Sequence, residues 1–219
     1  MDPTNPYAAY APPAPPIVYR QNVFVPPGAS TAPLLGPGLR NAKLVLGIVQ
    51  TLAIIVGVGL LFAGVAVRTQ TGDGAGLLMA GGVVFAFWNL TFFAYALLSM
   101  VWAYKFWSWI PPEHRHMSLW KSYVSPMQAT LFMLIPLFGV FWIIALNLGT
   151  AEILDRMRVA YPSNKPSAKN TAIIASVIPF VFFPAGPFVD YFFDRHVEGI
   201  AADMQAQMTA AVTPAGVSR

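Results

Sequence analysis

The sequence predicts an all-α, polytopic membrane protein of about four transmembrane helices, and three observations point to this class. Hydrophobic residues make up 56% of the 219 residues, and charged residues make up only 10%. Water-soluble folds of this size rarely reach such a balance. The apolar residues gather in blocks that are long enough to cross about 30 Å of hydrocarbon as helices. We expect spans at about residues 44–67, 75–104, 127–148 and 170–193.

The residues before the first span, 1–42, are predicted to be a disordered, Pro-rich cytoplasmic leader. They hold ten of the 20 prolines, which lack the backbone donor that helices and sheets require. The stretch from Ala11 to Tyr19 favours polyproline II, a conformation that aromatic-lined grooves of partner proteins bind. An extended, solvated segment is the alternative. These residues lack the basic start and the apolar core that mark a cleaved signal peptide. We therefore expect the first span to be retained.

Spans one and two are predicted to form an antiparallel hairpin, because only residues 68–74 separate them. Small residues recur four positions apart in both spans, and such pairs let helix backbones approach closely. The pairs are Ala53 with Gly57, Gly59 with Ala63, Gly76 with Ala80, and Gly82 with Ala86. The same small-residue faces could mediate self-association or binding to other membrane proteins.

Prolines are expected to interrupt the third and fourth spans. Pro136 lies inside the third span and predicts a kink or a re-entrant segment. The span is expected to continue into an amphipathic piece, residues 150–159, whose charged residues can form helical ion pairs. Three prolines, Pro179, Pro184 and Pro187, predict a broken fourth span. Residues 194–219 are expected to form an amphipathic C-terminal helix and tail.

The distribution of lysine and arginine gives a prediction of topology. With four crossings and a cytoplasmic N-terminus, eight basic residues lie inside and five outside. If the third block only enters the membrane and returns, the count becomes ten inside and three outside. Because cytoplasmic loops carry the excess of positive charge, this rule favours a re-entrant third block.

Two motifs resemble a pair found in a family of uncharacterised bacterial integral membrane proteins. The first runs Trp107-x-x-Ile110-Pro111-Pro112-x-x-Arg115, and the second runs Ile135-Pro136-x-Phe138-x-x-Phe141-Trp142. The resemblance covers about a fifth of the chain, and Gly139 replaces an asparagine that is frequent in that family. It implies a bacterial inner-membrane location and no particular activity.

Four polar residues within the spans are candidates for helix packing or for a polar path through the membrane. An amide in hydrocarbon is costly unless it is hydrogen-bonded, so each should face another helix. Packing is one interpretation, and a substrate or ion path is the other. The residues are Gln50, Asn89, Thr91 and Asn147.

Three carboxylates, Asp190, Asp194 and Glu198, follow one another at a spacing of four residues near the end of the fourth span. This spacing places them on one face of a helix. Such a face can bind hard cations or protons. The alternative is a solvated polar face on a helix that has already left the membrane.

The segment between the second and third spans is predicted to be an interfacial loop. Tryptophans gather at membrane–water boundaries, and basic residues there contact anionic headgroups. The two histidines are separated by one residue and lack a third ligand nearby, which disfavours a metal site. The residues of this loop are Trp107, Trp109, His114, Arg115 and His116.

Several functional classes lack their signatures in this sequence. The chain has no cysteine, which excludes disulfides and thiol chemistry. Motifs of metalloproteases, serine hydrolases, P-loops and dinucleotide sites are missing, so no cofactor is expected. The basic residues form no patch suited to nucleic acid, which leaves the lipid bilayer and other membrane proteins as expected partners.

The function that we expect is therefore that of a non-enzymatic accessory, assembly or scaffold subunit of a bacterial membrane. A small channel or transporter is the first alternative, with a polar path near Asn89 along the broken third and fourth spans. A lipid-modifying enzyme is the second alternative. It would require His114 or His116 to converge with Asp190 or Asp194.

Overall fold

The computed structural model describes residues 36–135 and 137–212. The predictions made for the chain before residue 36 and for Pro136 lie outside these residues. The described chain is all-α apart from one two-stranded ribbon, which confirms the predicted fold class. The elements are α1 (Pro37–Thr71), α2 (Ala75–Trp109), η2 (Pro112–His114), β1 (His116–Met117), β2 (Ser122–Tyr123), α3 (Pro126–Leu131), η3 (Phe132–Leu134), α4 (Phe138–Met157), α5 (Lys169–Val181), η4 (Phe183–Ala185) and α6 (Gly186–Val212).

In the part of the chain that the structure describes, three helices are long and apolar enough to cross a membrane: α1, α2 and α4. The first two have 35 residues each, and α4 has 20. A fourth apolar helix, α5, has 13 residues, fewer than a full crossing requires. The membrane-protein class predicted from hydropathy therefore agrees with the helix lengths.

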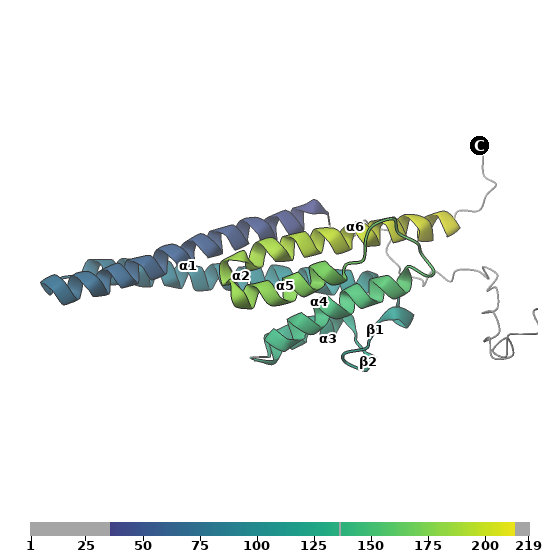
Figure 1. Ribbon diagram of the computed structural model, residues 1–219, viewed down its shortest axis with the longest axis horizontal. Coiled ribbons are helices and arrows are strands. Elements are labelled where there is room, and N and C mark those ends of the chain that lie inside the picture. The colour runs from purple at the N-terminus through teal and green to yellow at the C-terminus, as the bar shows by residue number, and fades with distance from the viewer. Residues whose placement is uncertain (1–35, 136, 213–219) are drawn as a thin grey trace, which may run out of the picture.

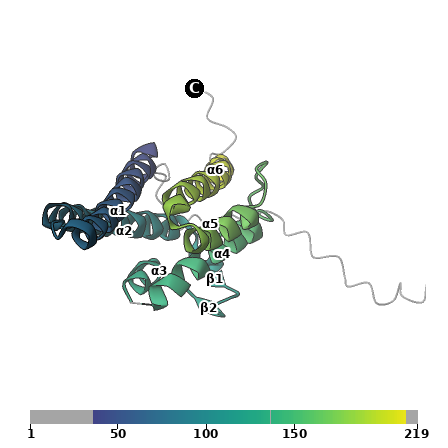
Figure 2. The same ribbon diagram turned by 60° about the vertical axis from the view of Figure 1, so that its left-hand side comes forward.

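Helices α1 and α2 form the predicted antiparallel hairpin (Figures 1 and 2). A left-handed residue, Gly72 with φ of 78°, ends α1, and its amide bonds to the Arg68 carbonyl as a C-cap. The helix begins at Pro37, earlier than predicted, since proline is favoured in the first turn of a helix. The predicted disordered leader is thus wrong from residue 37 onward.

The glycines that bring α1 and α2 together are Gly57, Gly64 and Gly81. A Cβ at Gly64 would lie 2.9 Å from the backbone nitrogen of Leu78, so only glycine allows this approach. The prediction from small-residue pairs is therefore correct for Gly57. It is wrong for Gly59, Gly76 and Gly82, which face open space on the outside of the hairpin.

Two neighbouring glycines allow a matched test of this packing. We expect Gly81→Leu to destabilise the protein by about 1–3 kcal/mol, the usual range for overpacking, because its Cβ would lie 2.9 Å from the side chain of Leu61. Gly82→Leu meets no atom within 4 Å and should leave stability unchanged or raise it. Thermal unfolding in detergent measures both variants. Equal effects of the two substitutions would contradict this account of the interface.

The third apolar block reverses direction between Leu134 and Phe138, and we call this point the first reversal. It follows α3, whose Ser125 and Gln128 form a capping box. Across it, the indole of Trp142 donates to the carbonyl of Ala129 at 3.0 Å. The block is therefore not one continuous span over residues 127–148, and the predicted return of the chain is the arrangement observed.

The fourth apolar block also reverses, between Val181 and Gly186, and we call this point the second reversal. Helix α5 ends at Val181, and α6 runs back beside it (Figure 1). The predicted break is confirmed at Pro184, which lies in η4, and at Pro187, which begins the return. It is wrong for Pro179, which lies inside α5 without ending it. A separate C-terminal helix from residue 194 is wrong, since α6 continues unbroken from Gly186 to Val212.

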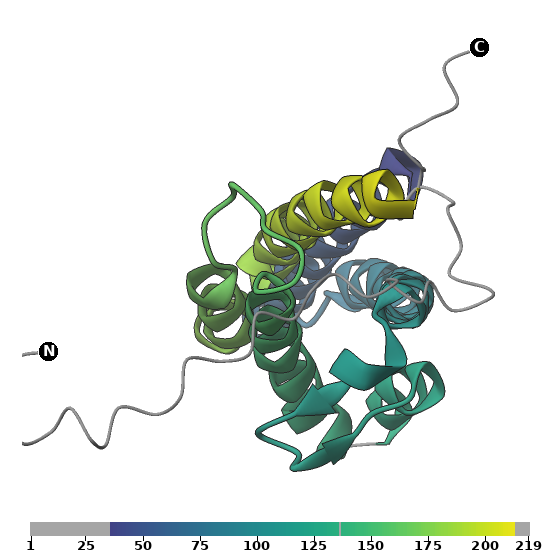
Figure 3. The same ribbon diagram turned by 90° about the vertical axis from the view of Figure 1, so that its right-hand side faces the viewer.

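The polar connections gather at one end of the molecule, which we call the loop end. It holds the start of α1, the β1–β2 ribbon, the α4–α5 connection and the later turns of α6 (Figures 1 and 3). The opposite end, the hairpin end, consists of the α1–α2 connection alone. The main core lies toward the loop end, where Phe106 and Trp107 of α2, Trp142 and Leu154 of α4, and Val197 of α6 are buried.

Candidate functional site: a buried polar seam

A buried row of charged and polar side chains joins α6 to α1 and α2, and we call it the polar seam. It is the largest departure from an otherwise apolar interior. Each of its three carboxylates comes from one face of α6, and each contacts a donor from α1 or α2. The seam consists of Arg40, Lys43, Tyr95, Trp102, Asp190, Asp194 and Glu198.

The centre of the seam is the ion pair between Lys43 and Asp194, with Nζ 2.6 Å from Oδ2. Both side chains are almost completely buried, at 7% and 4% exposure. A charge in such surroundings is tolerated only with a partner, because the cost of removing it from water is several kcal/mol. The pair therefore locks the start of α1 against α6 across about 150 residues of sequence.

The flanking carboxylates are paired on either side. Glu198 forms an ion pair with Arg40 and accepts the indole proton of Trp102 at 2.9 Å. Asp190 accepts a hydrogen bond of 2.7 Å from the hydroxyl of Tyr95. Asp190 has no ion pair within the described chain, so the seam contains three carboxylates and two cations.

Aromatic rings complete the surroundings of the two cations. The ammonium of Lys43 lies 5.1 Å from the ring centre of Trp102 and 5.8 Å from that of Tyr95. The guanidinium of Arg40 lies 5.4 Å from the ring of Tyr191. Cation–π contacts of this kind become stronger when they are removed from water. The rings therefore add to the ion pairs in holding α1 at this position.

The predicted spacing of the α6 carboxylates is confirmed, but their interpretation as a solvated face is wrong. Asp194 is 3% exposed and Glu198 is 7% exposed, because α6 packs against α1 and α2 instead of leaving the bundle. A cation bound to Asp194 or Glu198 would have to displace Lys43 or Arg40. Within the described residues, no three acidic or histidine side chains are grouped as metal ligands.

The four polar residues predicted within the spans have different surroundings. Asn89 donates to the carbonyl of Phe85 at 2.9 Å, and Thr91 donates to that of Trp88 at 2.8 Å, both within α2. The expected hydrogen bonds to another helix are therefore wrong for these two residues, whose own helix satisfies them. Gln50 is buried, and its Oε1 has no partner among the described residues. Asn147 is half-buried on α4.

The predicted interfacial residues divide into a buried and an exposed set. Trp107 is 1% exposed, so its expected place in the headgroup region is wrong; the end of α2 packs it into the core. Arg115 donates to the carbonyls of Ile110 at 2.7 Å and Ser108 at 3.1 Å. A basic side chain that bonds the last carbonyls of a helix stabilises its C-terminus. Trp109 is half-buried beside it.

The two histidines of this loop lie against α4. Arg156 donates to the backbone carbonyls of both His114 and His116. Partial burial lowers the pKa of His114, the nearby Arg156 lowers it further, and Glu113 opposes the shift. Asp190 and Asp194 face α1 and α2 instead. The enzyme alternative requires a contact between these histidines and these aspartates. Among the described residues, no hydrogen bond or ion pair joins the two sets.

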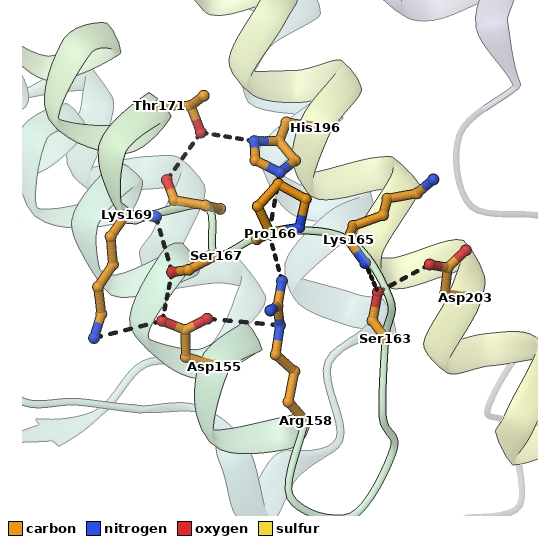
Figure 4. Close-up of polar contacts among 11 residues, drawn as sticks. Asp155, Arg158, Ser163, Lys165, Pro166, Ser167, Lys169, Thr171, His196 and Asp203 are labelled. Carbon is orange, nitrogen blue, oxygen red and sulfur yellow. Dashed lines mark hydrogen bonds and ion pairs between the residues drawn. The ribbon is translucent and has the colours of Figure 1, made fainter.

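A second polar network fastens the α4–α5 connection at the loop end (Figure 4). Asp155 pairs with Arg158 at 3.6 Å and with Lys169 at 3.4 Å, and Ser167 donates to it at 2.7 Å. From α6, a ring nitrogen of His196 lies 3.2 Å from the carbonyl of Pro166. The helical ion pairs predicted for the end of α4 are confirmed here and between Arg156 and Glu152.

The sequence reasoning missed four residues of the seam: Arg40, Lys43, Tyr95 and Trp102. One signal was present, because Arg40 and Lys43 are three residues apart and directly precede an uncharged span. That spacing places two cations on one helix face. The spacing does not indicate which of the nine acidic residues pair with these cations, since the partners lie near the other end of the sequence.

Fold and seam together define a multi-helical membrane protein whose buried charges join its helices. Comparison with known proteins gives no closer assignment: no family model, no curated protein and no solved structure matches this chain. The resemblance of the two motifs to a bacterial membrane family stays a prediction. Within the fold, Arg115 of the first motif caps α2, and Trp142 of the second joins α3 to α4.

Proposed function

We propose that the protein is a non-enzymatic accessory, assembly or scaffold subunit of a bacterial inner membrane. The observation that carries this proposal is the polar seam. Two of its carboxylates pair with cations, and the third, Asp190, accepts a hydrogen bond from Tyr95, so the seam holds helices together. Buried charge in a transporter or an enzyme instead faces a cavity or a substrate. The exposed surface of the helices is then the part of the molecule that meets lipid and partner proteins.

The proposed placement in the membrane follows from charge. Among the described residues, every lysine and arginine except Arg68 lies at the loop end or just inside it. Positive charge concentrates on the cytoplasmic side, so we place the loop end in the cytoplasm. In this placement α1 and α2 cross the bilayer. The first and second reversals then enter from the cytoplasmic side and return to it.

Single cysteines test this placement cleanly, because the chain has no cysteine of its own. In intact cells, a membrane-impermeant maleimide should label Asp73→Cys at the hairpin end. Val159→Cys at the loop end should react only after the inner membrane is permeabilised. Val181→Cys at the second reversal should stay unlabelled until detergent is added. Labelling of Val159→Cys in intact cells would instead support four full crossings and contradict the placement.

The scaffold function itself predicts a bound partner. The full chain, extracted from bacterial membranes in mild detergent, should keep a stoichiometric membrane protein through size-exclusion chromatography. Mass spectrometry identifies that protein, and cross-linking from exposed positions of α1 or α2 locates its contact. A chain that elutes alone and monodisperse would contradict the proposal.

One observation favours a channel or transporter as the second candidate. The second reversal meets α1 near mid-helix, where the Thr51 hydroxyl donates to the Pro184 carbonyl at 3.4 Å. Next to it along α1, Gln50 has a buried amide oxygen that no described residue hydrogen-bonds. Broken helices with free backbone carbonyls bind ions in many transporters. Ion flux into proteoliposomes that Gln50→Leu abolishes would support this candidate over the scaffold.

A further inference from the structure

We propose that the protein is a membrane wedge that concentrates in bilayers whose loop-end leaflet is expanded by curvature. The partner is thus a curved lipid surface. The inference rests on the proposed placement of the loop end and the two reversals. It starts from an asymmetry along the molecule: α3, α4, α5 and α6 lie beside the α1–α2 hairpin toward the loop end, and no other described helix lies beside it at the hairpin end (Figures 1 and 2).

The depth of the second reversal is given by its contacts. It touches α1 where Thr51 bonds to Pro184, and α2 where the rings of Trp88 and Phe183 are 6.4 Å apart. About 12 Å of helix separates Thr51 from Lys43, and about 25 Å separates it from Arg68. These two basic residues bound the uncharged part of α1. On α2, Trp88 lies about 23 Å from Asp73 and about 26 Å from Lys105 along the helix. The second reversal therefore enters from the loop end and ends near the middle of the bilayer.

Both reversals expose large apolar side chains. Phe180, Phe182 and Phe183 are exposed at the second reversal, and Leu134, Ile135 and Leu137 are exposed at the first. The other ends of the same helices carry charges, such as Lys169 on α5 and Arg195 on α6. A helical insert with an apolar tip and a charged base lies in one leaflet with its base among the headgroups. The acyl chains of that leaflet are therefore the partner that contacts the exposed side chains of both reversals.

The hairpin end has no comparable cover. From residue 52 to residue 71, the packed positions of α1 are Ala53, Gly57 and Gly64, and those glycines contact α2. Large side chains such as Phe62 and Met79 point outward there. A helix that is apolar all round in this way lies in lipid.

The two leaflets therefore hold different amounts of protein. Of the helices that the structure describes, α1 and α2 alone cross the leaflet at the hairpin end in this placement, whereas α3, α4, α5 and α6 add to them at the loop end. A helix about 10 Å wide occupies roughly 80 Å² in the membrane plane, so four add roughly 300 Å² to one leaflet. A bilayer accommodates such a difference by curving so that the loop-end leaflet has more area.

The wedge can act on the bilayer only if the extra helices cannot fold away, and two sets of contacts hold them. The Lys43–Asp194 pair fixes α6 to α1. At the first reversal, Trp142 bonds to the Ala129 carbonyl and packs against Trp120 and Phe132, with ring centres 5.1 Å and 4.9 Å apart. The shape is thus fixed by contacts in the polar seam and across the first reversal.

The test uses the full chain in giant vesicles of phosphatidylethanolamine and phosphatidylglycerol, from which narrow membrane tubes are pulled outward. A fluorophore on Asp73→Cys reports density, and an impermeant quencher distinguishes the two orientations. Molecules with the loop end outward should be enriched several-fold in the tube, increasingly so as the tube narrows. Molecules with the loop end inward should be depleted. Equal density in tube and vesicle for both orientations would overturn the inference.

Control measurements separate failure of the inference from failure of the proposed placement. If Val181→Cys in the same vesicles reacts with an impermeant maleimide, the placement itself is wrong. If it is protected and sorting is still absent, only the wedge is wrong. A Val181→Cys chain that forms disulfide-linked dimers efficiently would show that a second copy covers the tip, which also overturns the inference. Sorting should be weakened by Val181→Lys and unchanged by Val159→Lys.

Discussion

Replacing Lys43 by methionine is expected to destabilise the protein by about 3–5 kcal/mol, the range for breaking a buried ion pair. The substitution keeps an unbranched apolar side chain that is one atom shorter, but leaves Asp194 buried without a cation, between Asp190 and Glu198 on the same face of α6. Reversible unfolding in mixed detergent micelles measures the change in the free energy of unfolding. No other single substitution considered for this chain combines so much burial with so much uncompensated charge.

The matched control for this prediction is Lys105→Met, because Lys105 is exposed on α2. It should change stability by no more than about 0.5 kcal/mol, as surface substitutions usually do. Adding Asp194→Leu to Lys43→Met should recover most of the loss, since an apolar pair of similar volume can replace a buried ion pair. A double variant as unstable as the sum of the single ones would show that the two residues do not act as a pair.

Val181→Lys is expected to be the most disruptive change on the surface of the protein once it is in a bilayer. Val181 is 77% exposed at the second reversal, where we place acyl chains. A lysine in the hydrocarbon costs up to about 3 kcal/mol on insertion scales. We therefore expect the second reversal to move toward the headgroups. Hydrogen–deuterium exchange in proteoliposomes should be faster across residues 176–188.

Val159→Lys provides the control, because Val159 is 90% exposed at the loop end just after α4. The two substitutions are chemically identical and differ only in their position along the molecule. We expect no change in exchange or thermal stability from Val159→Lys. If both lysines behave alike in a bilayer, the second reversal lies in water and the proposed placement fails. In detergent, where the micelle adapts to the protein, the difference between the two variants should shrink.

Local patterns predicted much of the secondary structure and part of the site. Hydropathy identified α1 and α2 because a helix in lipid needs an uncharged run of about 20 residues, which is a local property. The spacing of Asp190, Asp194 and Glu198 placed them on one face because helical periodicity is also local. The prolines of the fourth block predicted its break for the same reason, since proline removes a helical hydrogen bond wherever it stands.

The interpretation of these patterns required the tertiary structure. Proline stops a helix but does not say whether the chain continues or reverses. At the second reversal, Pro187 fits against Gly47, where a Cβ would come within 2.3 Å of the proline ring, and this close contact seats the returning α6. The aromatic residues at the end of α2 illustrate the same limit. Trp107 looks like a headgroup anchor in sequence, but it is buried in the main core.

The sequence alone thus determined that the chain is helical, that it belongs in a membrane, and that α6 carries three carboxylates on one side. Only the tertiary structure decided that these carboxylates pack against Arg40, Lys43 and Tyr95, with Asp194 and Glu198 buried, and that two apolar blocks turn back. The physical reason is the range of the interactions. Hydropathy and helical spacing act over a few residues, whereas an ion pair between residues 43 and 194 exists only once the helices have packed.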